Sequence, residues 1–145
     1  WKVLHYLRSK DLVENIADTI QFYKKYNCAH ASAEFASIPE ICQAIHQAGG
    51  VAVIAHPGLK VKYADLDAFR SALIRLLDFG LDGVECYYPA HSDELTQVCL
   101  DVCKERDLLI TSGSDFHGSF GRTEIGQLQI EVEKVNLGKL LENKN

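Results

Sequence analysis

Asp115 and His117 stand one residue apart in the segment TSGSDFHG, directly after the apolar run LLI. Side chains two positions apart in an extended chain point to the same side, so the carboxylate and the imidazole are expected to share one direction. These two ligand types suit zinc, manganese or iron, and two of them on one side of a strand can share one ion. Gly113 and Gly118 leave room for the backbone to bend and for a ligand to approach.

Side chains of the same chemical types follow two other apolar runs. His56 ends the run VAVIAH, and Glu85 lies within GVECYY, which leads into His91. Glu85 and His91 could bind metal, orient its ligands or hold substrate. Arg122 could bind a phosphate through two parallel hydrogen bonds. Structural roles are the alternatives: a buried histidine at 56, a salt bridge for Glu85, a helix cap for His91 and a solvated surface position for Arg122.

The spacing of apolar residues predicts the elements that must position these groups. Helices are expected over 11–26, from Ser37 to about residue 48, over 65–79 and from Ser92 to about residue 106, with a short one after Val135. Strands are expected over 51–56, 83–88, 108–115 and 125–132.

Two helices carry further signals. Leu12, Ile16, Ile20 and Tyr23 form an apolar stripe on the first helix. On the second, Ser37 and Glu40 match a capping box, and Ile41, Ala44 and Ile45 are expected to face inward.

The alternation of strands and helices predicts an α/β fold with a parallel sheet. Functional groups of such folds gather at the carboxyl ends of the strands. His56, Asp115 and His117 are therefore expected to converge at one edge of the sheet and to bind a metal ion.

Composition limits the class of protein. The 145 residues suit one domain, and 47% hydrophobic with 24% charged residues is typical of a soluble globular protein. A net charge of -5 argues against general nucleic-acid or anionic-membrane binding. No apolar run approaches the roughly 20 residues of a membrane span. Five cysteines without a CxxC pair predict reduced thiols, Cys99 and Cys103 among them, and a cytoplasmic protein.

Three segments, AGGVAVIAHPG, GLDGVECYYPAHS and LLITSGSDFHG, resemble in this order the later motifs of the PHP (polymerase and histidinol phosphatase) superfamily. The likeness is closest to its branch of small metal-dependent phosphoesterases. The resemblance implies the C-terminal part of a distorted TIM-like (β/α)7 barrel, with two or three divalent ions (Mn, Zn, Fe or Mg) at the strand ends. By position it implies that His56, Asp115 and His117 are metal ligands, and that His91 lies near the substrate phosphate.

One part of the family pattern is missing. Members open with an HxH motif followed by Asp, His and Glu ligands, and this chain has no HxH. A complete barrel takes roughly 250 residues. Residues 1–145 are therefore expected to be a single partial PHP domain that lacks its N-terminal half and has little activity alone.

The resemblance implies hydrolysis of a phosphomonoester, a nucleotide or related small phosphate, by a metal-activated water. The three predicted ligands would hold the ions, His91 would contact the phosphate or protonate the leaving oxygen, Arg122 would contact substrate and Glu85 would support the ligands. Two alternatives stay open. One is a non-catalytic PHP-like module that scaffolds or regulates a larger protein, and the other is a histidinol-phosphate phosphatase.

Overall fold

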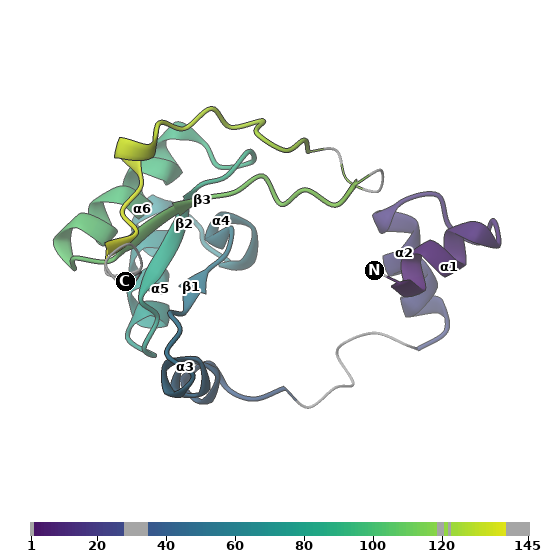
Figure 1. The fold of residues 1–145 in the computed structure, drawn as a ribbon, viewed down its shortest axis with the longest axis horizontal. Helices are drawn as coiled ribbons and strands as arrows, with labels where there is room; N and C mark the ends of the chain where they lie inside the picture. The colour runs from purple at the N-terminus through teal and green to yellow at the C-terminus, as the bar shows by residue number, and fades with distance from the viewer. Residues whose placement is uncertain (1, 28–34, 119–120, 122, 139–145) are drawn as a thin grey trace, which may run out of the picture. The chain divides into compact units, whose positions relative to one another are not determined.

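The computed structural model describes residues 2–27, 35–118, 121 and 123–138. The chain forms two compact units, which Figure 1 draws. The helical unit comprises Trp1–Phe35 and Phe116–Ile125, and the sheet unit comprises Ala36–Asp115 and Gly126–Asn145. The expectation of a single partial domain is not tested by this division and stays a prediction.

The sheet unit is built on three parallel strands in the order β1-β2-β3. These strands are β1 (Val53–Ile54), β2 (Gly83–Tyr87) and β3 (Leu109–Ser112). The helices α4 (Pro57–Lys60) and α5 (Leu66–Leu77) connect β1 to β2, and α6 (Asp93–Glu105) connects β2 to β3 (Figure 1). The predicted α/β class with a parallel sheet is confirmed, whereas the TIM-like barrel stays a prediction.

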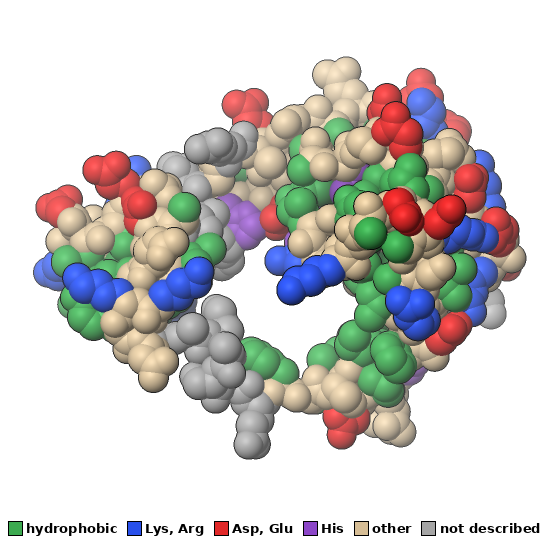
Figure 2. All heavy atoms as spheres, turned by 180° about the vertical axis from the view of Figure 1, so that it is seen from behind, with side chains coloured by type: hydrophobic (Ala, Val, Ile, Leu, Met, Phe, Trp, Pro, Cys, Tyr) green, Lys and Arg blue, Asp and Glu red, His purple; other side chains and the backbone are tan. Residues whose placement is uncertain are grey.

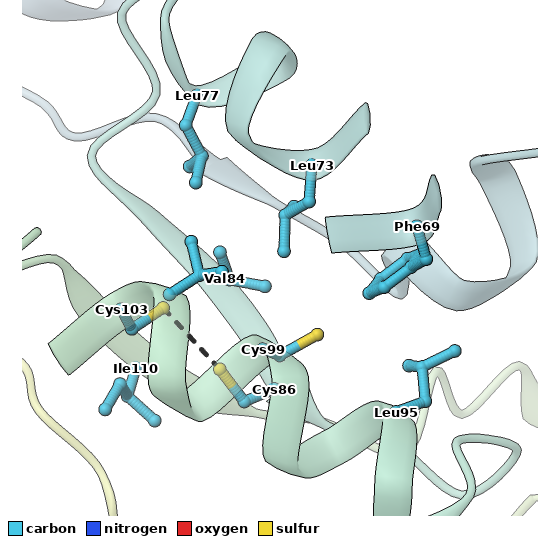
Figure 3. Packing of buried hydrophobic residues seen from close by; sticks show 10 residues of the cluster. Phe69, Leu73, Leu77, Val84, Cys86, Leu95, Cys99, Cys103 and Ile110 are labelled. Atoms are coloured by element: carbon cyan, nitrogen blue, oxygen red, sulfur yellow. Dashed lines mark hydrogen bonds between the residues drawn. The ribbon is translucent and has the colours of Figure 1, made fainter. Parts of the chain in front are cut away.

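The core of the sheet unit lies between the sheet and the helices α5 and α6 (Figure 3). Residues from both helices and two strands form it: Phe69, Leu73, Leu77, Val84, Cys86, Leu95, Cys99, Val102, Cys103 and Ile110. Cys99 and Cys103 are fully buried free thiols, as expected for apolar cysteines. A hydrogen bond with Cys103 and burial both raise the pKa of Cys86, so this thiol stays protonated.

The helix α3 (Ile38–Gln47) begins where the capping pattern predicted. The Glu40 carboxylate accepts hydrogen bonds from the Ser37 backbone N–H at 2.7 Å and from its hydroxyl at 2.6 Å. These bonds lower the pKa of Glu40. The predicted inward face is wrong, because Ile41 is 44% exposed while Cys42 is 2% exposed. The helix turns its small Cys42 toward Gly80.

The helical unit contains α1 (Lys2–Ser9) and α2 (Ile16–Lys25), so the single helix predicted over 11–26 begins later than expected. Asn15 caps the start of α2, because its side chain accepts a hydrogen bond from the Asp18 N–H at 3.1 Å. Leu12 and Ile20 of the predicted stripe are exposed. The small core consists instead of Leu4, Leu7 and Val13, with Phe22 and Tyr23 packed against them.

The fourth strand predicted over 125–132 is wrong, since no strand occurs in that segment. Ile125 and Val132 are 80% and 70% exposed, and the segment ends in a short 3-10 helix, η3 (Val132–Lys134). The outer edge of β3 instead pairs with Asn136, which exchanges backbone hydrogen bonds of 2.8 and 3.0 Å with Ile110. Alternating apolar residues make a strand only where a partner edge accepts them. The helix predicted after Val135 falls largely on residues 139–145, outside the described part of the chain. None of the described helices is long and apolar enough to cross a membrane.

The side chain that caps α5 offers a test of local stability. The Asp65 carboxylate accepts a hydrogen bond of 2.8 Å from the Ala68 N–H at the start of this helix. Asp65→Ala is expected to lower the free energy of unfolding by about 1 kcal/mol, because that N–H loses its partner. Denaturation with urea measures the change. Ser71→Ala, at an exposed position of the same helix, is the control and should stay within about 0.5 kcal/mol of the parent. Equal effects of the two variants would contradict the capping role.

Candidate functional site

The carboxyl ends of the three parallel strands meet at one edge of the sheet. His56 follows β1 by two residues, Tyr88 follows β2 directly, and Asp115 follows β3 by three residues. Pairing of Ile54 with Val84 and of Tyr87 with Ser112 sets these three segments side by side. The site is therefore built by the register of the sheet.

His56 occupies an unusual backbone conformation. Its φ of 32° and ψ of 57° lie in the left-handed region, and it precedes the first turn of α4. Such a conformation is disfavoured for a residue with a side chain and persists where the surroundings hold it. The carboxylate of Glu85 accepts a hydrogen bond from the His56 N–H at 2.7 Å. The ring atom Nδ1 of His56 is buried and has no hydrogen-bond partner among the described residues.

Asp115 also has a left-handed backbone, with φ 51°. Its carboxylate interacts with the hydroxyl of Tyr88 and acts on the pKa of that group. Burial, the negative charges of Asp115 and Glu85, and hydrogen bonding with Asp115 raise the pKa of Tyr88, so the hydroxyl keeps its proton. The ring centroid of Tyr88 lies 5.2 Å from that of His56. His56 and Asp115 thus contact the same buried tyrosine from two different strand ends.

Glu85 lies on β2, the central strand, and its carboxylate is close to the segments that follow β1 and β3. A Cβ atom added to Gly113 would come within 2.2 Å of Oε1 of Glu85. The second carboxylate oxygen, Oε2, holds the backbone of His56. Only glycine fits at position 113 without displacing this carboxylate. The predicted support of a ligand by Glu85 remains a prediction, and its bond to the His56 backbone is the contact that would provide it.

Both ring nitrogens of His91 contact backbone groups. Nδ1 lies 3.0 Å from the carbonyl oxygen of Cys86, and Nε2 accepts a hydrogen bond of 3.2 Å from the N–H of Gly58. The ring also packs edge-on against Tyr88, with centroids 5.3 Å apart. Burial lowers the pKa of His91, so the neutral imidazole is favoured. The predicted contact with a substrate phosphate stays a prediction, and this conformation leaves neither nitrogen available for it.

Two further predicted site residues are not tested by the structure. His117 belongs to the helical unit, and its role as a third ligand stays a prediction. Arg122 lies outside the described residues. The structure therefore joins His56, Glu85, His91 and Asp115 around one tyrosine.

Comparison with known proteins finds two curated relatives of this chain. A 5'-3' exoribonuclease from Haemophilus influenzae is 32% identical over 136 residues, which cover 90% of this chain and 48% of that protein. A phosphoribosyl 1,2-cyclic phosphate 1,2-diphosphodiesterase from Eggerthella lenta is 30% identical over 100 residues, which cover 69% of this chain and 36% of that protein. No family model matches the chain.

A solved structure from Bifidobacterium adolescentis, described as that of a metal-dependent phosphoesterase, shares the fold with a TM-score of 0.63. It is 25% identical, and the match covers 88% of this chain and 45% of that one. The chain belongs to the PHP superfamily. It spans less than half the length of each of these proteins.

The donor types in this PHP site suit a divalent metal ion. A neutral imidazole and a carboxylate are ligands for zinc, manganese and iron. A metal could satisfy the buried Nδ1 of His56, which no group in the described part of the chain contacts by a hydrogen bond. Within the described parts of the chain, no group of three or more His, Cys, Asp or Glu side chains is arranged to hold an ion. His56 and Asp115 therefore fit as part of a ligand set that needs further donors.

Sequence reasoning missed Tyr88 as a member of the PHP site. In GVECYYPAHS the two tyrosines read as apolar strand residues. Its place in the sequence could have indicated this role, because Tyr88 comes just after β2, as His56 and Asp115 come shortly after β1 and β3. Its 8% exposure and its contacts with both predicted ligands became visible only in three dimensions.

Proposed function

We propose that the protein is a metal-dependent phosphoesterase that hydrolyses a phosphomonoester of a nucleotide or a related small phosphate. The observation that supports this proposal best is the shared contact of His56 and Asp115 with Tyr88 at the carboxyl ends of parallel strands. An imidazole and a carboxylate there, separated by 59 positions along the chain, supply the donor types that such chemistry needs.

In the proposed mechanism, His56, Asp115 and His117 would hold the divalent ions. A bound ion would offset the charge of the phosphate oxygens and lower the pKa of a water molecule toward 7, which makes it a nucleophile. The hydroxyl of Tyr88 interacts with the Asp115 carboxylate and would help to orient it. Glu85 fixes the backbone of His56 in its left-handed conformation.

Surface charge supports a small substrate. On the face of the molecule shown in Figure 2, Lys and Arg side chains are interspersed with Asp and Glu over the sheet unit. A long nucleic acid is bound by a continuous basic surface, and the net charge of -5 also disfavours one. A small phosphate needs only the local positive charge of the site.

Hydrolysis of a phosphodiester is the second candidate, because the two curated relatives are a diphosphodiesterase and an exoribonuclease. Both reactions use the same activated water and differ in the leaving group.

We also propose a cytoplasmic location, because Cys42, Cys86, Cys99 and Cys103 are buried free thiols, which suits a reducing compartment.

The test is a substrate comparison on the complete protein that contains this chain. It is purified without metal, given Mn²⁺, and assayed with a nucleoside 5'-monophosphate, histidinol phosphate and a short 5'-phosphorylated RNA. Release of inorganic phosphate from the nucleotide that EDTA abolishes and Mn²⁺ restores would support the monoesterase. Release of nucleotides from the RNA would favour the diesterase. Absence of hydrolysis of all three with Mn²⁺, Zn²⁺ and Fe²⁺ would sink both and favour a non-catalytic module.

A further inference from the structure

The segment His56-Pro57-Gly58 leads from β1 into α4, whose first two residues are Pro57 and Gly58, and we call this segment the turn. Proline has no backbone N–H, so these three residues offer only two backbone donors. Glu85 accepts from the N–H of His56 at 2.7 Å, and His91 accepts from the N–H of Gly58 at 3.2 Å. Side chains from the β2 region thus take both donors of the turn.

His91 is itself firmly placed. Its Nδ1 contacts the carbonyl oxygen of Cys86 at 3.0 Å, and its ring packs against Tyr88. Because Nε2 accepts from a backbone N–H, it carries no proton, and Nδ1 then carries the ring proton and donates it to Cys86. The neutral ring has no hydrogen-bonding capacity left for a substrate.

Gly58 is fitted to this ring. A Cβ atom at position 58 would lie 2.8 Å from Cδ2 and 2.9 Å from Nε2 of His91, and 3.0 Å from a methyl group of Leu95. Real Cβ atoms do not approach neighbours that closely, so any side chain here would push the turn and the imidazole apart. Glycine at 58 and histidine at 91 therefore form one packed contact.

The turn needs such support because of the backbone of His56. A left-handed conformation of a residue with a side chain persists only where its surroundings hold it. The hydrogen bond to Glu85 fixes His56, before Pro57, and the hydrogen bond to His91 fixes Gly58, after Pro57. A metal ligand must be held in the right direction before the ion arrives, and groups that fix it contribute to metal affinity without touching the ion.

We propose that His91 is a positioning residue, which holds the Gly58 N–H and thereby fixes the turn that carries His56, instead of contacting the phosphate. The effect on metal binding rests on the proposed function, in which His56 is a ligand. The effect on the conformation of the turn is independent of the proposed function.

The experiment compares His91→Ala, His91→Gln and Gly58→Ala in the complete protein, with His46→Gln as the control histidine. His46 lies on α3, where it pairs with Asp82 at 2.7 Å. Hydrogen exchange at the Gly58 amide reports on the turn, and titration with Mn²⁺ in the absence of substrate reports on the ligand. Far-UV circular dichroism checks that each variant is folded.

We expect His91→Ala and Gly58→Ala to speed hydrogen exchange at the amide of residue 58. Both should also weaken Mn²⁺ binding by about 10–100-fold, the usual effect of losing a group that supports a ligand. His91→Gln keeps an acceptor near Nε2 and should recover part of both losses. The shape of the pH–rate profile should not change in any variant, because no proton is moved by His91. His46→Gln should resemble the parent protein.

Two results would overturn the proposal. The first is an unchanged exchange rate at Gly58 in His91→Ala, which decides the matter even if the parent protein binds no Mn²⁺. The second is unaltered Mn²⁺ affinity together with the loss of one limb of the pH–rate profile, which would make His91 a proton donor. Failure of the proposed function would look different: the parent protein itself would neither bind Mn²⁺ nor release phosphate. If His91→Ala does not fold, His91→Gln and Gly58→Ala carry the same two readouts.

Discussion

His56→Ala is expected to remove metal-dependent phosphate release from the complete protein and to weaken Mn²⁺ binding. The loss should exceed the roughly 10–100-fold that follows from removing a group which only supports a ligand. The reason is that alanine removes a donor atom itself, along with the imidazole that packs against Tyr88. Phosphate release at saturating substrate and calorimetric titration with Mn²⁺ measure the two effects.

The matched control is His46→Ala, which removes the same kind of side chain from the opposite end of the strands. His46 contacts Asp82, and Asp82 also accepts from the N–H of Ala52, so this pair lies where β1 and β2 begin. We expect Mn²⁺ affinity and turnover to stay near parental values. If His56→Ala retained parental Mn²⁺ affinity, His56 would not be a ligand and the proposed metal site would be wrong.

Phe69→Ala is expected to have the largest effect on stability, a loss of about 3–5 kcal/mol in the free energy of unfolding. The ring is 0% exposed, lies in the core between α5 and α6 (Figure 3), and meets Tyr63 edge-on with centroids 5.1 Å apart. Alanine would lose the buried apolar surface and leave a cavity that the surrounding side chains fill only in part. Such a loss is a large fraction of the roughly 5–15 kcal/mol that stabilises a typical domain.

Urea denaturation followed by circular dichroism measures this change, and Phe79→Ala is the matched control. Phe79 is 47% exposed, just beyond the end of α5, so its removal should cost much less. Equal losses for the two variants would mean that the buried cluster does not dominate the stability of the sheet unit. A loss below about 1 kcal/mol for Phe69→Ala would contradict the packing directly.

Local signals predicted most of the sheet unit correctly. Short apolar runs predicted the three strands, and caps at Ser37 and Ser92 predicted the starts of α3 and α6. The caps act between residues close in sequence, so they can be recognised without knowledge of the fold. Predictions that depended on a distant partner were wrong. Residues 125–132 alternate apolar and polar side chains but form no strand, and the side chain of Ile41 in α3 is exposed.

The sequence by itself determined which chemical groups the protein presents at its strand ends. His56 and Asp115 follow apolar runs, and parallel strands place the residues that follow them at one edge. The tertiary structure alone decided how these groups are held. Tyr88 joins the two of them, and His91 holds the Gly58 N–H across 33 positions of the chain. Such contacts depend on register and on distances of a few ångströms, which the order of residues along the chain does not specify.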